Sequence, residues 1–215
     1  MLHLRRQDFD DLDHLYRINL MNSCSGFKSA NLIGTKSNDG IPNVAVFSSV
    51  THLGSNPPLL GVVFRPVSDV PRNTYENIKE TGQFTVNHIH LDIIEQAHHT
   101  SAKYDKRISE FDITELEEEY KNNWHAPFVK RAPIQIALTY CEEYKIKANN
   151  TIQLIAEIKD LYIKDDIIEQ DGFINLSKAN IVAINGLDGY ALPSLKQRID
   201  QQPFLWREML VMMRS

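Results

Sequence analysis

The sequence predicts a mainly β protein, an antiparallel barrel that carries a few helices. Apolar and polar residues alternate over 84–88, 134–140 and 152–158, with the period of two that marks half-buried strands. Turn sequences such as KANNT separate neighbouring strands. Helices do not alternate regularly with the strands, which argues against a parallel doubly wound sheet.

The N-terminal half begins with a short helix and continues with three strands. Asp8 is suited to cap the helix. Strands over 30–35 and 43–47 flank the turn SNDGIP, in which Asp39-Gly40 supplies the positive φ angles of a tight hairpin. The apolar run 59–64 lies between prolines and has the length of a buried strand.

Capping signals predict further helices. Asn73 is a candidate cap, Glu76 stands where a capping box needs it, and Gly82 suits a left-handed stop. A second helix is expected over 93–99. The acidic stretch TELEEEYKNNW, residues 114–124, is expected to form a solvated surface helix that begins with its own capping box.

Composition limits the classes of partner. The chain has 215 residues, 42% hydrophobic and 24% charged, as in an ordinary globular protein of one domain. A net charge of −5 disfavours nucleic acids and anionic membranes. Cys24 and Cys141 form no disulfide framework, and Cys141 is expected to be buried in a strand. We therefore expect a cytoplasmic protein without membrane segments.

Two stretches are suited to an anionic ligand. The helix start VPRNTYENI offers free N–H groups, part of a positive charge and the Arg72 guanidinium. Ser48, Ser49 and Thr51 place small hydroxyl side chains just after a predicted strand. Considered alone, the first stretch is better explained as an ordinary capped helix with a surface arginine, and the anion site is favoured only when both stretches are taken together.

Other motifs are weaker. Neither the Gly-x-Gly-x-x-Gly dinucleotide pattern nor a P-loop occurs. The string His88-Ile-His90-Leu-Asp92 is similar to the metal ligands of some hydrolases, but further ligands are lacking, and a polar strand end is the simpler explanation. His98 is a candidate proton source or a surface residue. We expect no metal site.

Three blocks together resemble the flavin reductase-like family. They are NVAVFSSVTHLGSNPPLLGVVFRP, PRNTYENIKETGQFTVN and HHTSAKYDKRISEFD, in the family's order and spacing over about residues 24–165. The resemblance implies a Greek-key split β-barrel that binds FMN as a homodimer. It also implies one domain over 1–215, with both terminal extensions packing on the barrel or on the partner subunit.

The resemblance also implies the residues that bind the cofactor. The 43–51 segment would contact the flavin ring and ribityl chain, Arg72 to Thr74 the phosphate, and the remaining residues the edge of the cofactor. The full set is Asn43, Val46, Phe47, Ser48, Ser49, Val50, Thr51, Phe64, Arg65, Arg72, Asn73, Thr74, Asn87, Thr100 and Ser101. No catalytic acid or base is expected, because the flavin carries the hydride chemistry.

Two departures from the family pattern matter. Phe27-Lys28-Ser29 replaces a Pro-Arg-Pro-like segment, which leaves flavin contacts there in question. Arg72-Asn73-Thr74 replaces Lys-Asp-Thr, and the loss of the aspartate charge favours phosphate binding.

The expected activity is that of an NAD(P)H:flavin oxidoreductase, which passes electrons to free flavin, a partner oxygenase or another acceptor. NADH or NADPH is the expected co-substrate. The alternative is a non-catalytic FMN-binding module or electron carrier. The apolar segment FLWREMLVMM, residues 204–213, is expected to pack on the barrel or on a partner subunit.

Overall fold

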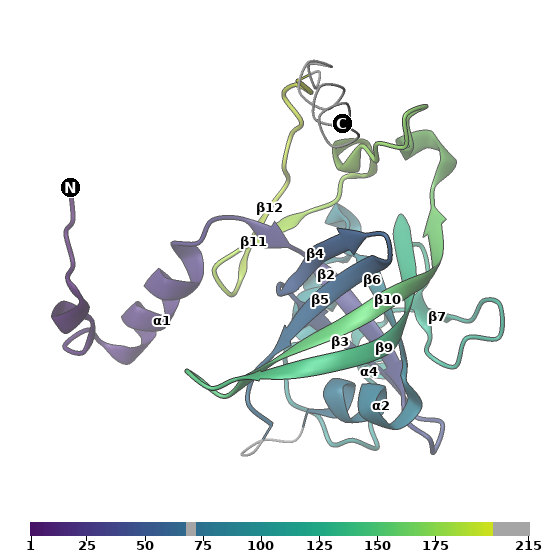
Figure 1. The fold of residues 1–215 in the computed structure, drawn as a ribbon, viewed down its shortest axis with the longest axis horizontal. Coiled ribbons are helices and arrows are strands. Elements are labelled where there is room, and N and C mark those ends of the chain that lie inside the picture. The colour runs from purple at the N-terminus through teal and green to yellow at the C-terminus, as the bar shows by residue number, and fades with distance from the viewer. Residues whose placement is uncertain (68–71, 200–215) are drawn as a thin grey trace, which may run out of the picture.

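The computed structural model describes residues 1–67 and 72–199, and its centre is an antiparallel sheet of seven strands that curls into an open barrel (Figure 1). The spatial order is β3-β2-β6-β9-β10-β5-β4. The strands are β2 (Asn31–Lys36), β3 (Pro42–Phe47), β4 (Val50–Ser55), β5 (Pro58–Phe64), β6 (Gln83–His88), β9 (Ile134–Ile146) and β10 (Thr151–Ile163). The predicted mainly β antiparallel split barrel is confirmed.

Two edge strands, β3 and β4, are consecutive in the chain and end the sheet on opposite sides. Only Ser48 and Ser49 separate them. The predicted strands all occur, each within a few residues of its expected bounds, and Gly40 has a φ of 87° in the turn between β2 and β3. The barrel therefore splits at the segment that carries the small hydroxyl side chains.

Small sheets flank the barrel. One has the order β1-β11-β12, from β1 (Lys28–Ser29), β11 (Ala183–Asn185) and β12 (Gly189–Ala191). The other pairs β7 (Glu118–Glu119) with β8 (Phe128–Val129). The helices are η1 (Arg6–Phe9), α1 (His14–Ser23), α2 (Asn73–Thr81), η2 (Leu91–Ile93), α3 (Ile94–His99), α4 (Glu110–Thr114), η3 (Asp165–Ile167) and η4 (Leu176–Ala179).

The sheet has an apolar surface on each face. Inside the barrel, buried side chains from nearly every strand pack together, among them Ile33, Phe64, Phe84 and Leu138. On the outer face of β2 and β3, Leu32 and Val44 pack against residues of α3, α4 and β11. Burial of both faces explains why α3 and α4 lie where they do: they cover apolar surface that the barrel cannot bury itself.

The acidic stretch 114–124 does not form the predicted helix. The short helix α4 ends at Thr114, and Glu115 follows in the left-handed region with a φ of 61°. Thr114 Oγ1 donates to the carbonyl of Glu110, one helical turn earlier, and does not cap a following helix. The chain then runs extended into β7, because its polar side chains find partners on the barrel that a solvated helix would not have.

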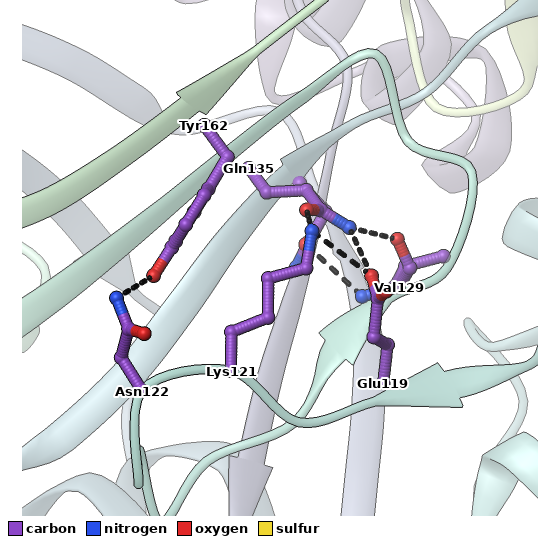
Figure 2. Close-up of polar contacts among 7 residues, drawn as sticks. Glu119, Lys121, Asn122, Val129, Gln135 and Tyr162 are labelled. Carbon is purple, nitrogen blue, oxygen red and sulfur yellow. Dashed lines mark hydrogen bonds and ion pairs between the residues drawn. The ribbon is translucent and has the colours of Figure 1, made fainter.

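Figure 2 shows how the acidic stretch is attached to the barrel. Lys121 donates to Gln135 Oε1 on β9 at 2.6 Å and pairs with Glu119 at 3.1 Å. The Gln135 amide donates in turn to the carbonyl of Val129 at 2.7 Å, and Asn122 donates to the Tyr162 hydroxyl at 2.7 Å. These contacts, which range from the buried Gln135–Val129 bond to the exposed Asn122–Tyr162 bond, fix the loop against the sheet.

The N-terminal arm extends away from the barrel (Figure 1). Helix α1 has no buried residue, and Leu15 at 68% and Tyr16 at 50% are exposed. Its cap is Asp13, which accepts from the N–H groups of Leu15 and Tyr16. The prediction that Asp8 caps this helix is wrong. Asp8 lies in η1, where its carboxylate accepts a hydrogen bond from the Arg5 N–H.

Two other expectations concern the periphery. Cys141 is exposed, contrary to the sequence prediction, because β9 runs on beyond the barrel and its second half is largely solvated. The predicted apolar packing segment 204–213 lies outside the described residues. Within the described ranges, every helix is too short or too polar to traverse a lipid bilayer.

Candidate functional site

An aromatic row brings three distant segments together. The rings of Phe47, at the end of β3, and Phe64, at the end of β5, meet edge to face with centroids 5.2 Å apart. Tyr75, in the first turn of α2, meets Phe64 in the same way at 5.5 Å. The ends of β3 and β5 are therefore linked to the start of α2, and the two sequence-predicted patches share one region of the molecule.

The hydroxyl segment is held at the mouth of this region. Ser49 Oγ donates to the carbonyl of Val63 at 2.8 Å, and its own carbonyl accepts from the Val63 N–H at 3.3 Å. Ser48 and Val50 are half-buried, whereas Thr51 is exposed on β4. The turn between the two edge strands is thus fixed while its neighbouring polar groups stay accessible.

The start of α2 differs from the prediction by one residue. The cap position is Arg72, not Asn73, and no side chain caps the helix, so the predicted capping box with Glu76 is absent. The first backbone bond of the helix runs from the Glu76 N–H to the Arg72 carbonyl at 2.9 Å. The N–H groups of the first turn are free of helical partners, and Gly82 ends the helix with a φ of 70°, as predicted.

Arg72 carries an unsatisfied donor at this helix start. Its Nε is buried and makes no hydrogen bond to any residue that the structure describes. Burying a polar donor without a partner costs about 1–3 kcal/mol, and such groups are rare in folded proteins. A guanidinium beside uncapped helical N–H groups is a suitable site for an anion such as a phosphate.

The outer edge of β3 is closed by side chains from α2, α3 and α4. Thr100 Oγ1, just after α3, accepts from the Val46 N–H at 2.8 Å and donates to the Ala97 carbonyl at 2.7 Å. The Asn43 amide lies 3.1 Å from Thr74 Oγ1 and 3.1 Å from Glu110 Oε2. The backbone donor of Val46 is therefore already used within the protein.

The remaining sequence-predicted residues differ in how accessible they are. The Asn87 amide is fully buried and donates to Leu32 and Thr85, while its oxygen accepts from the Val129 N–H. All its polar atoms are used, so its role in this structure is to join β6 to β2 and β8. Arg65 and Ser101 are exposed, and Asn73 is half-buried at the helix start.

The histidines do not form a metal site. Within residues 1–67 and 72–199, no three His, Cys, Asp or Glu side chains lie together as a metal ion requires. Burial lowers the pKa of His88 to about 4, so this residue is neutral at physiological pH. His98 is half-buried, and its Nδ1 lies 3.3 Å from the Tyr190 hydroxyl. His90 pairs with Asp92 at 3.6 Å.

Sequence reasoning missed Glu110 and Tyr75. Glu110 is 5% exposed and lies against Asn43, and burial raises the pKa of its carboxyl. In the sequence it stands between Ser109 and Phe111 and resembles a surface glutamate. Tyr75 directly follows Arg72, Asn73 and Thr74, and only these three polar residues indicated a site in this part of the sequence. An amphipathic reading of the first turn of α2 would have found it.

The comparisons decide the family. The sequence model described as "Flavin reductase like domain" matches residues 25–177. The chain belongs to the flavin reductase-like family. A crystal structure from Shewanella frigidimarina, provisionally named a flavin reductase with a split barrel domain, is 43% identical. It aligns over 94% of this chain and 100% of that one, with a TM-score of 0.90.

More distant members share the fold. Nitrilotriacetate monooxygenase component B from Bacillus cereus is 17% identical, with a TM-score of 0.80 over 93% of this chain and 98% of that one. The FMN-binding protein of Thermus thermophilus is 13% identical, with a TM-score of 0.68 over 81% and 91%. Its membership of the flavin reductase-like family makes this chain a flavin-related oxidoreductase. Its unsatisfied Arg72 donor and the uncapped start of α2 fit the phosphate of a flavin nucleotide.

Proposed function

We propose that this protein binds FMN and catalyses its reduction by NADH or NADPH. When bound, FMN would supply the hydride chemistry, and the protein would supply binding, orientation and exclusion of water. The flavin reductase-like family supports a flavin oxidoreductase. The choice of FMN as cofactor, and of a nicotinamide as co-substrate, is our proposal.

The unsatisfied Nε of Arg72 is the observation that carries the proposal. A buried guanidinium donor at an uncapped helix start has a purpose if a phosphate accepts its hydrogen bond. The N–H groups of Asn73 and Thr74 would complete the phosphate site. Riboflavin has the ring of FMN without this phosphate, so the two compounds separate phosphate binding from ring binding.

The hydroxyl segment would hold the rest of the cofactor. The Ser48 hydroxyl in the turn where the barrel splits and the Thr51 hydroxyl at the start of β4 offer donors and acceptors, and Ser49 Oγ can still accept, with little bulk to obstruct a planar ring. Phe47 is half-buried and packs edge to face on the buried Phe64, so it forms an apolar floor next to this turn. A fixed floor and a fixed turn would orient the ring without any acid or base from the chain.

The assembly is proposed to be a homodimer. Helix α1 exposes Leu15 and Tyr16 and buries none of its residues, and a helix of ten residues is marginal without packing. A partner subunit would supply that packing. We further propose one domain over the whole chain, a cytoplasmic location, and free flavin, a partner oxygenase or another acceptor as the destination of the electrons.

Anaerobic reduction tests the proposed activity. Protein loaded with FMN should lose the absorbance of oxidised flavin when NADH or NADPH is added. Calorimetry with FMN and riboflavin should first show binding. If FMN binds but neither nicotinamide bleaches it, the protein is an FMN-binding module or electron carrier and the reductase proposal is wrong.

A further inference from the structure

A chain of three buried polar side chains runs from α4 to the first turn of α2. Glu110, the first residue of α4, is 5% exposed, and Asn43 on β3 and Thr74 on α2 are each 6% exposed. The Asn43 amide bridges the other two, with both contacts at 3.1 Å. A buried carboxyl is costly to desolvate unless it is hydrogen-bonded, and the Asn43 amide is the side chain that contacts it here.

The direction of the hydrogen bonds along these three side chains depends on whether Glu110 is protonated. When Glu110 is ionised, it can only accept, so the Asn43 nitrogen donates to it and the Asn43 oxygen accepts from the Thr74 hydroxyl and from the Val44 N–H. In that pattern the proton of the Thr74 hydroxyl points away from the helix start. The hydroxyl has none left to donate to a ligand there.

When Glu110 is protonated, the opposite pattern becomes available. The carboxyl donates to the Asn43 oxygen, and the Asn43 nitrogen donates to Thr74 Oγ1. In this pattern the Val44 N–H faces the Asn43 nitrogen, so the Glu110 carboxyl becomes its acceptor. The Thr74 hydroxyl is freed to donate to a phosphate at the start of α2. The same protonation removes a buried negative charge close to that phosphate, so both effects favour binding in the same direction.

We propose that Glu110 is a positioning residue that couples proton uptake to phosphate binding, through Asn43 and Thr74. This inference rests on the proposed binding of FMN. By linkage, if a proton on Glu110 strengthens binding of the phosphate, the bound phosphate holds that proton more firmly. The affinity for FMN should therefore fall as Glu110 ionises with rising pH.

Glu110 is the titratable member of this set of three side chains, and other charged groups lie around it. Burial raises the pKa of Glu110, and the backbone N–H groups of Val44 and Glu110 itself oppose this rise. The charged groups nearby line an adjoining cavity of about 100 Å³: Asp39 after β2, Glu76 and Glu80 on α2, and Lys106 and Arg107 before α4. Asp112 on α4 is exposed, and α3 contributes His98 and His99 at its far end.

A matched pair of variants tests the coupling. Glu110→Gln carries an amide that can donate to the Asn43 oxygen at every pH, so it imitates the protonated state. Asp112→Asn removes an exposed carboxylate from the same helix and is the control. The dissociation constants for FMN and riboflavin are measured for each protein by calorimetry between about pH 5 and about pH 8.

For FMN, the ratio of the wild-type to the Glu110→Gln dissociation constant should rise with pH by about tenfold, the size of a lost charge-assisted hydrogen bond. The ionisation of FMN's own phosphate, with a pKa of about 6, cancels in this ratio. For riboflavin and for Asp112→Asn the ratio should stay constant. Parallel pH profiles of wild type and Glu110→Gln would overturn the inference while leaving FMN binding intact.

A spectroscopic measurement on the wild type removes any dependence on the folding of the variant. Infrared difference spectra should show the carbonyl band of a protonated carboxylic acid appearing when FMN binds, and no such band with riboflavin. Absence of this band over the whole pH range would refute proton uptake. Failure of the wild type to bind FMN at any pH would instead refute the proposed function.

Discussion

Thr100 accepts a hydrogen bond from the backbone N–H of Val46 at 2.8 Å, across 54 residues of sequence. The hydroxyl occupies the outward side of β3, the edge strand next to the split in the barrel. Edge strands with free N–H groups can pair with strands of other chains. Here the Thr100 side chain, just after α3, binds one of these N–H groups. The contact joins the helix that covers the outer face to the strand that leads into Ser48 and Ser49.

Replacing Thr100 tests the energetic value of this contact. Thr100→Val leaves the half-buried Val46 N–H without its acceptor, and we expect a loss of about 1–3 kcal/mol in the free energy of unfolding. Thr100→Ser keeps the acceptor and should lose much less. Urea denaturation followed by circular dichroism measures both. Equal stability of the two variants would mean that solvent replaces the hydroxyl.

Arg72→Ala tests the phosphate site. Loss of a charge-assisted contact should weaken FMN binding by about 1.5–3 kcal/mol, roughly tenfold to more than a hundredfold. Riboflavin affinity should hardly change, because riboflavin lacks the phosphate. Lys79→Ala, at the other end of the same helix, is the control for a general loss of positive charge. Equal weakening of both flavins would place Arg72 at the ring instead.

His88 makes the stability of the protein depend on pH. Burial lowers its pKa from 6.5 to about 4, so the unfolded chain binds a proton at a higher pH than the folded chain does. Stability is therefore complete above pH 6.5 and falls as the pH drops towards 4, by up to about 3 kcal/mol.

His88→Gln removes this titration, and the variant should lose less stability than the wild type over the same pH range. Chemical denaturation at a series of pH values gives the two curves. Curves of the same slope would show that His88 is solvated or paired in solution. His3→Gln, which removes an exposed histidine, is the control.

The N-terminal arm is predicted to contribute to the dimer. Leu15→Glu places a charge on the exposed apolar side of α1, where Leu15 is 68% exposed, and should shift sedimentation towards the monomer. His14→Glu adds the same charge to a neighbouring position of the helix and should leave the dimer largely intact. The free energy of unfolding of the barrel within one subunit should not change, because α1 buries no residue against it.

Local patterns in the sequence were sufficient for the strands and for most turns. The alternation over 134–140 and 152–158 marks β9 and β10, although both strands run beyond these bounds. The left-handed stop at Gly82 follows from glycine's freedom at positive φ. The start of α2 was misplaced by one residue, since capping signals cannot reveal that Arg72 takes the cap position without using its side chain.

The acidic segment shows where local patterns fail. Its composition is typical of a solvated helix, yet Lys121 and Glu119 are bound to Gln135 on a strand that the local pattern does not include. The candidate site divides in the same way. The hydroxyl segment and the helix start were found from residue types, whereas the role of Glu110 depends on its contact with Asn43, 67 residues earlier in the chain, across the packed outer face.

By itself the sequence determined the antiparallel strands, the flavin reductase-like blocks and the polar residues around the split in the barrel. Only the tertiary structure decided which of these residues are free. It uses the polar atoms of Asn87 and the N–H of Val46 within the protein, leaves the Nε of Arg72 without a partner among the described residues, and buries Glu110. The physical reason is that strand propensity is a property of neighbours in sequence, whereas burial and hydrogen-bond satisfaction arise when distant segments pack into one core.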